Sequence, residues 1–178
     1  MRLQQTRRPR LELQSAVGPF AQPVLGRNPT GFHRVKKLTE KSHYEIGNLT
    51  YNSLSGSIPL NIVGCFQLLS LILNNNNLSG EIQPELDALD SLKILDVSNN
   101  KISGEIPLTL VGCKSLEVVD LSYNNLSGPL NDVLTKWSNL RYLSLSHNKL
   151  SGPLAIWIFM FESIQTIDLS GNYWRKKS

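Results

Sequence analysis

The sequence predicts a right-handed solenoid of the α/β class, with short parallel strands on the concave face and irregular or 3-10 segments on the convex face. Three observations predict it. An asparagine recurs every 24 residues, aliphatic residues precede it at one fixed spacing, and a glycine follows it four residues later. Self-similarity at a period of this length is typical of solenoid architectures. The repeated asparagines are Asn52, Asn76, Asn100, Asn124, Asn148 and Asn172.

The aliphatic residues before each asparagine predict one short strand per coil. Leu71 and Leu73 before Asn76 show the spacing, with one residue between them. Side chains alternate between the two faces of a strand, so such a pair points inward together. Stacked coils then form a parallel sheet along the inner curve. A further apolar column, predicted to be buried in the same way, comprises Ile62, Leu86, Leu110, Leu134 and Ile158.

The remaining repeated positions are predicted to be structural. Each asparagine turns the chain out of its strand, and its amide can bond backbone groups of neighbouring coils that otherwise lack partners. The Ser-Gly pair that follows permits a tight turn, because glycine tolerates positive φ. The proline-bearing segment then returns along the outer curve without donating hydrogen bonds.

The periodicity divides the chain into three parts. Residues 1–43 have no repeat and are expected to be an irregular or disordered leader. Residues 44–174 form the solenoid, with four complete coils and a partial coil at each end, and residues 175–178 form a basic tail. No capping unit is recognisable at either end, although solenoids normally need one. We therefore expect the chain to be an internal piece of a longer protein.

Charge is unevenly distributed along the chain. The net charge of +4 combines +6 in residues 1–47, −5 in residues 48–172 and +3 in the last six residues. A basic arm for nucleic acid is disfavoured, because the repeats themselves are acidic and the termini are expected to be solvated tails. No apolar stretch follows the first basic residues, so no signal peptide is predicted. The longest apolar run spans eight residues, whereas a membrane span needs about 20.

The chain offers no catalytic or metal-binding constellation. Cys65 and Cys113 are 48 residues apart, which is two coils. That places them roughly 10 Å apart, beyond the ~7 Å limit for bridged Cα atoms, so both should be free, buried and inert. His147 is expected to be a surface residue. Phosphate-binding loops, a nucleophile elbow and zinc-ligand spacings are absent from the sequence, which predicts a protein that is not an enzyme and needs neither cofactor nor metal.

Residues between the inward leucines are predicted to line the concave face and to bind ligand. They mix carboxylates, hydroxyls and a few aromatic rings, which suits an extended peptide or another protein surface. An acidic ridge that attracts a cationic ligand is one interpretation, and ordinary filler between leucines is the other. The predicted contact residues are Ile72, Asn74, Ile94, Asp96, Ser98, Val118, Asp120, Ser122, Tyr123, Tyr142, Ser144, His147, Thr166 and Asp168.

Three N-x-[ST] sequons are candidate N-glycosylation sites, at Asn48, Asn77 and Asn125. Asn77 and Asn125 directly follow a repeated asparagine, where a glycan is tolerable on the turn out of the strand. Asn48 is expected to face the concave strip, where a glycan would obstruct binding.

The repeat resembles the plant-type leucine-rich repeat, L-x-x-L-x-L-x-x-N-x-L-S-G-x-I-P, which residues 102–107 (ISGEIP) follow closely. Residues 77–152 further resemble the ectodomains of CLAVATA-type receptor-like proteins, because the non-consensus segments QPELDALD (83–90) and TKWSN (135–139) match them. The resemblance implies an extracellular position at the plasma membrane, a kinase-like membrane partner, and perception of small secreted peptides in meristem development. The alternatives are a soluble leucine-rich-repeat inhibitor of a cell-wall-degrading enzyme, or a truncated fragment that does not signal.

Overall fold

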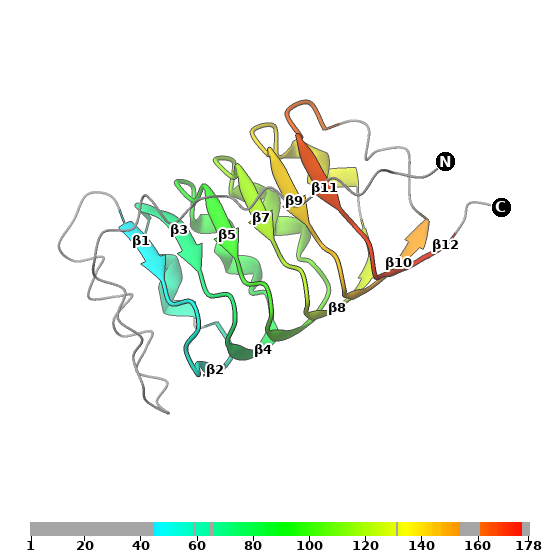
Figure 1. Cartoon of the computed structure of the whole chain (residues 1–178). Coiled ribbons are helices and arrows are strands. Elements are labelled where there is room, and N and C mark those ends of the chain that lie inside the picture. The colour runs from blue at the N-terminus through cyan, green and yellow to red at the C-terminus, as the bar shows by residue number, and fades with distance from the viewer. Residues whose placement is uncertain (1–44, 59, 65, 131, 154–160, 176–178) are drawn as a thin grey trace.

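Stacked coils follow one another along a single axis in this computed structural model (Figure 1). It describes residues 45–58, 60–64, 66–130, 132–153 and 161–175. The expected leader, Cys65, Ile158 and the last three residues of the tail lie outside the described residues. Within them, two parallel sheets of six strands each run the length of the stack.

The first sheet confirms the strands predicted before each asparagine. Leu71, Leu95, Val119 and Leu143 pair in register from coil to coil, so the 24-residue period sets the alignment of the sheet. All four side chains are at most 1% exposed. The strands of the first sheet are β1 (Glu45–Asn48), β3 (Leu68–Ile72), β5 (Ile94–Asp96), β7 (Val118–Asp120), β9 (Tyr142–Ser144) and β11 (Thr166–Asp168).

The second sheet was not predicted, because its strands contain the Ser-Gly pairs that read as tight turns. The glycines do adopt positive φ, as expected, with +82° at Gly104. Successive coils repeat the same bend, so their backbone groups still meet in parallel register. A Cβ at Gly104 would lie 2.8 Å from Cγ of Glu81, so a side chain here would also displace the exposed Glu81 side chain. These strands are β2 (Ser55–Gly56), β4 (Asn77–Glu81), β6 (Lys101–Gly104), β8 (Asn125–Pro129), β10 (Lys149–Pro153) and β12 (Tyr173–Arg175).

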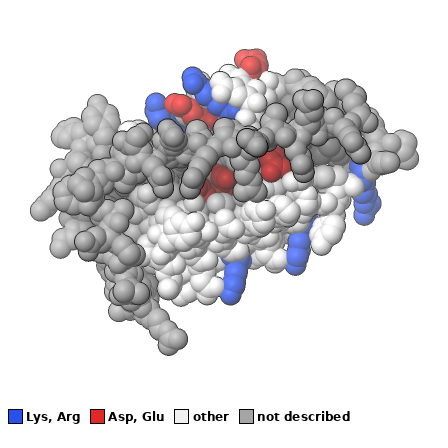
Figure 2. All heavy atoms as spheres, viewed as in Figure 1, with Lys and Arg blue, Asp and Glu red and all other residues white. Residues whose placement is uncertain are grey.

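Basic side chains gather on the second sheet. Lys101 and Lys149 begin β6 and β10, Arg175 ends β12, and all three are exposed. Figure 2 shows Lys and Arg along the lower edge of the molecule, where Figure 1 places the second sheet. The first sheet carries the aspartates instead, so the two sheets present surfaces of different charge.

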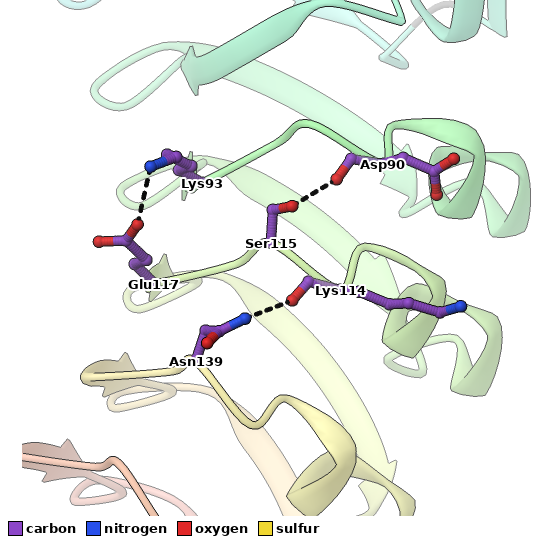
Figure 3. A network of polar contacts seen from close by, with 6 residues as sticks. All are labelled: Asp90, Lys93, Lys114, Ser115, Glu117 and Asn139. Atoms are coloured by element: carbon purple, nitrogen blue, oxygen red, sulfur yellow. Dashed lines mark hydrogen bonds and ion pairs between the residues drawn. The ribbon is translucent and has the colours of Figure 1, made fainter.

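The convex side consists of 3-10 segments, as predicted, but it does donate hydrogen bonds. Backbone N–H groups donate within the 3-10 segments, as Leu110 N–H does to Pro107 O (3.0 Å). Side chains just after these segments donate to a carbonyl of the preceding coil: Ser115 Oγ to Asp90 O (2.7 Å) and Asn139 Nδ2 to Lys114 O (3.1 Å). Figure 3 shows both contacts with the nearby Lys93–Glu117 ion pair. The expectation of a non-donating return segment was wrong. The 3-10 helices are η2 (Leu60–Gly64), η3 (Pro84–Ala88), η4 (Leu108–Gly112) and η5 (Asp132–Lys136).

One apolar core runs through all the coils. The four described members of the predicted closing column, from Ile62 to Leu134, are at most 3% exposed. Full burial of such a side chain contributes about 1.5–3 kcal/mol. Trp137 is 1% exposed and its indole Nε1 donates to Leu110 O at 3.2 Å, so its polar atom is satisfied within the core.

The asparagine ladder, meaning the six repeated asparagines, confirms its predicted structural role. Asn100 Nδ2 donates to Leu73 O of the preceding coil (3.0 Å) and to Val97 O and Ser98 O of its own coil (3.0 and 3.1 Å). Its Oδ1 accepts the N–H of Leu78 at 2.9 Å. One amide therefore joins two coils and fixes the turn out of the strand.

The coil of Asn172 keeps the ladder bonds but differs at one position. Trp174 occupies the column that holds leucine or isoleucine in earlier coils, and its Nε1 donates to Leu169 O at 2.7 Å. In earlier coils the equivalent carbonyl accepts the amide of the next asparagine, as Leu145 O does from Asn172. The indole thus makes the bond that a following asparagine makes in earlier coils.

Among the described helices, none is long and apolar enough to cross a bilayer.

Candidate functional site

The predicted contact residues do come together on the outward surface of the first sheet, here called the strand face. Its central column holds the aspartates: Asp96 pairs with Asp120, and Asp168 follows beyond Ser144, in one register. The outward alternation of side chains places this column between the inward leucines. The predicted residues fall into three columns: Ile94, Val118, Tyr142 and Thr166; then Ile72, Asp96, Asp120, Ser144 and Asp168; then Asn74, Ser98 and Ser122.

Serines predicted as contact residues are instead used within the coils. Ser98 and Ser122 are only 5% and 6% exposed. Each donates both its Oγ–H and its backbone N–H to Oδ1 of the aspartate two residues earlier, with Oγ–Oδ1 distances of 2.7 Å to Asp96 and 2.6 Å to Asp120. Ser144 is buried too, at 3%. Ser98 and Ser122 thus hold the carboxylates of Asp96 and Asp120 in place.

Burial changes the protonation of the central column. Desolvation raises the pKa of Asp96 to about 6; the bonds from Ser98 oppose that rise, and the charge of Asp120 adds to it. Burial also pushes the pKa of Asp168 up, but hydrogen bonds from Ser170 and Ser146 and the charge of His147 hold it below its usual value. At Asp96 burial is therefore a larger cause of the raised pKa than the neighbouring carboxylate.

A rim of left-handed residues borders the strand face, which we did not predict. Asn75, Asn99, Tyr123 and His147 have φ between 52° and 56°. Each directly precedes an asparagine of the ladder. The signal lay in the sequence, because this column contains asparagines and ends in Gly171, and these residue types tolerate φ > 0. Tyr123 and His147 stack, with ring centroids 4.3 Å apart and an interplanar angle of 17°.

Comparison with known proteins places this geometry in a family. Leucine-rich repeat profiles match residues 67–89, 90–135 and 114–173, the middle one being described as two repeat copies. The ectodomain of the Arabidopsis receptor kinase SOBIR1 is 33% identical, with a TM-score of 0.68, and the match covers 74% of this chain and 72% of that one. The chain belongs to the leucine-rich repeat family.

Other plant ectodomains share the leucine-rich repeat fold. The Arabidopsis BIR3–SERK2 complex matches at 39% identity and a TM-score of 0.66, covering 73% of this chain and 69% of that one. Arabidopsis HAESA, solved with the peptide hormone IDA and the co-receptor SERK1, matches at 35% identity and 0.70, covering 78% and 23%. The chain spans only 17–23% of three larger receptor chains that it matches. No curated protein sequence matches it.

The leucine-rich repeat ectodomain fold is typical of non-catalytic binding proteins. Cys113 is free and buried, and its Sγ donates to Leu86 O at 3.0 Å. Burial, with Asp87 and Asp90 nearby, raises the pKa of this thiol to about 11, so the thiolate that a nucleophile or metal ligand needs is disfavoured. In the described part of the chain, no three His, Cys, Asp or Glu residues are grouped so as to hold a metal ion.

The three sequons of this leucine-rich repeat chain differ in accessibility. Asn77 and Asn125 are exposed at the beginnings of β4 and β8, on the second sheet. Asn48 is half-buried at the end of β1, and its Oδ1 accepts both the N–H and the hydroxyl of Thr50, at 3.1 and 2.7 Å. Its register partner is Ile72, so it lies on the first sheet as the sequence predicted.

Proposed function

We propose that this chain is a ligand-binding part of a plant receptor-like ectodomain, which holds an extended peptide or protein segment against the strand face. The observation that carries the proposal is the column of aspartates in register, Asp96, Asp120 and Asp168, each fixed by a serine. Pre-organised carboxylates bind a cationic group without first having to be ordered. The similar ectodomain of HAESA was solved with a peptide hormone, which supports the same class of ligand here.

Within that class, we propose that the parent protein is of the CLAVATA type and resembles the second CLAVATA protein. The non-consensus segments at residues 83–90 and 135–139 support this assignment. The ligand would then be a small secreted peptide that acts in meristem development. The parent would lie on the extracellular side of the plasma membrane and signal with a kinase-like partner, for which the co-receptor in the HAESA complex is a precedent. Residues 44–174 are the part that binds.

Removal of the central carboxylate charges tests the strand face as the binding surface. Asp96→Asn and Asp120→Asn together keep the Oδ1 atoms that accept from the serines, so the coils should fold unchanged. A displayed library of random dodecapeptides, selected on the full wild-type chain, should be enriched in Lys and Arg. The double variant should lose most of that retention, whereas Glu85→Gln, an equivalent neutralisation at an exposed convex position, should not.

The same selection distinguishes the alternatives. Equal retention of peptides by the wild type and the double variant would show that these carboxylates are not part of the binding surface. Slowing of a pectin-cleaving enzyme by the full chain, with no peptide retained, would replace the receptor proposal with the soluble inhibitor.

A further inference from the structure

Two aromatic rings on the rim occupy a backbone conformation that disfavours them. Tyr123 and His147 have φ of 54° and 55°, in the left-handed region, where a side chain with a Cβ is sterically strained. The same column holds asparagine at positions 75 and 99, where the strain is smaller, and a third aromatic residue, Tyr51, in coil one. An aromatic residue in such a position therefore makes the fold less stable than asparagine would. Strained positions of this kind cluster at ligand-binding sites.

The two rings are held rigidly and remain accessible. The N–H of Tyr123 donates to Ser146 O at 2.9 Å and the N–H of His147 to Ser170 O at 2.8 Å, so each backbone is tied to the next coil. Tyr123 is 39% exposed and His147 is also exposed. A Cβ at Gly171 would lie 2.7 Å from His147 Nδ1, which shows that the imidazole extends over a residue without a side chain.

Negative charge adjoins the stacked pair. Asp120 lies three residues before Tyr123, and its Oδ2 accepts from the hydroxyl of Tyr142 at 3.5 Å. Asp168 is close enough to His147 to interact with it electrostatically. An aromatic face beside a carboxylate attracts a guanidinium or ammonium group through both the ring quadrupole and the opposite charge. An isolated aromatic pair or an isolated aspartate would recognise such a group less selectively.

We propose that Tyr123 and His147 form a subsite that binds an Arg or Lys side chain of an extended peptide, with Asp120 and Asp168 as its counter-charges. The proposal rests on the strand face being the binding surface and assigns the determinant of specificity to its rim. The stacked pair supplies a flat surface at low entropic cost, because both rings are already ordered before the ligand arrives. The left-handed strain is retained because asparagine at these positions would not bind the cation.

Substitution of asparagine, the residue at positions 75 and 99 of the column, for both Tyr123 and His147 tests the subsite. Tyr123→Asn with His147→Asn should fold at least as stably as the wild type in urea, because the left-handed strain is relieved. In the dodecapeptide display on the full chain, retention of wild-type-selected Arg-containing peptides should fall about five- to thirtyfold. Replacing Arg by citrulline in those peptides should weaken wild-type binding to the same extent and barely affect the variant. Tyr51→Asn, at the same column but in coil one, is the matched control: it relieves the same strain and should leave peptide retention unchanged.

The outcomes separate the subsite from the binding surface. Unchanged retention of Arg-containing peptides by the Asn variant, with retention lost on neutralising Asp96 and Asp120, would overturn the subsite and leave the proposed function standing. Loss of binding accompanied by lower stability would also overturn it, because the rings would then act through the fold. A wild-type chain that retains no peptide at all would overturn both.

Discussion

Replacement of Asn100 tests how its side-chain amide holds neighbouring coils together. Aspartate, although similar in shape to asparagine, should destabilise the fold more than alanine. Of the four bonds that its amide makes, the three acceptors keep other partners. Leu73 O still accepts from Asn76 and Val97 O from Asn124, while Ser98 O still accepts from the N–H of Asn75. The N–H of Leu78 depends on Asn100 Oδ1. One buried donor is therefore left unsatisfied when the side chain is truncated.

This accounting sets the magnitude. An unsatisfied buried donor costs about 1–3 kcal/mol and each lost bond about 0.5–1.5 kcal/mol, so Asn100→Ala should cost about 3 kcal/mol of unfolding free energy. Asn100→Asp preserves the acceptor for Leu78 but points an anionic oxygen at three carbonyls. It should therefore be more destabilising than alanine at neutral pH, although it is nearly isosteric with asparagine.

Urea unfolding of the full chain, followed by circular dichroism, measures both variants. The midpoint should fall in the order wild type, Ala, Asp, with similar slopes. Asn52→Asp is the control and should be milder, because Asn52 Nδ2 donates to Leu49 O and Thr50 O, both in its own coil. An aspartate at position 100 that is tolerated as well as alanine would refute the donating role of the amide.

Three further predictions follow from single contacts. Trp174→Phe removes the indole donor to Leu169 O and should speed amide exchange in β11 and β12 about fivefold, while β5 is unaffected. Expression in a secreting eukaryotic host should attach glycans that disappear with Asn77→Gln and Asn125→Gln but not with Asn48→Gln; a glycan at Asn48 alone would contradict the exposures. Asp96 binds its proton more tightly in the folded chain, so the unfolding free energy should fall by about 2–3 kcal/mol as pH rises from 4 to 7, relative to Asp96→Asn; a flat difference would refute the burial.

The 24-residue period made much of the fold predictable. A fixed period places equivalent residues in register, so the strand at Leu71 and the bonds of Asn100 follow from alternation and from unpaired backbone groups. Burial of Leu110 follows from the same regularity. These features depend on one coil and its neighbour, which the repeat describes completely.

Other features depend on contacts that appear only when the coils are stacked. A Ser-Gly pair has the local preferences of a turn, and its strand character at Gly104 comes from pairing with Leu126 in the next coil. Ser115 and Asn139 donate to carbonyls of the preceding coil, and no short sequence motif predicts these bonds. The burial of Ser98 was also not predicted, although its bond to Asp96 lies within one coil. The strand face itself stays a prediction as a ligand site.

The binding surface can be tested most directly by hydrogen–deuterium exchange of the full chain, with and without a peptide retained in the display selection. We expect slower exchange on binding in the first sheet, at β5, β7 and β9, and around the rim, at residues 122–124 and 146–148. The second sheet, at β6, β8 and β10, should exchange at unchanged rates. Protection confined to the second sheet would contradict the assignment of the ligand to the aspartate column.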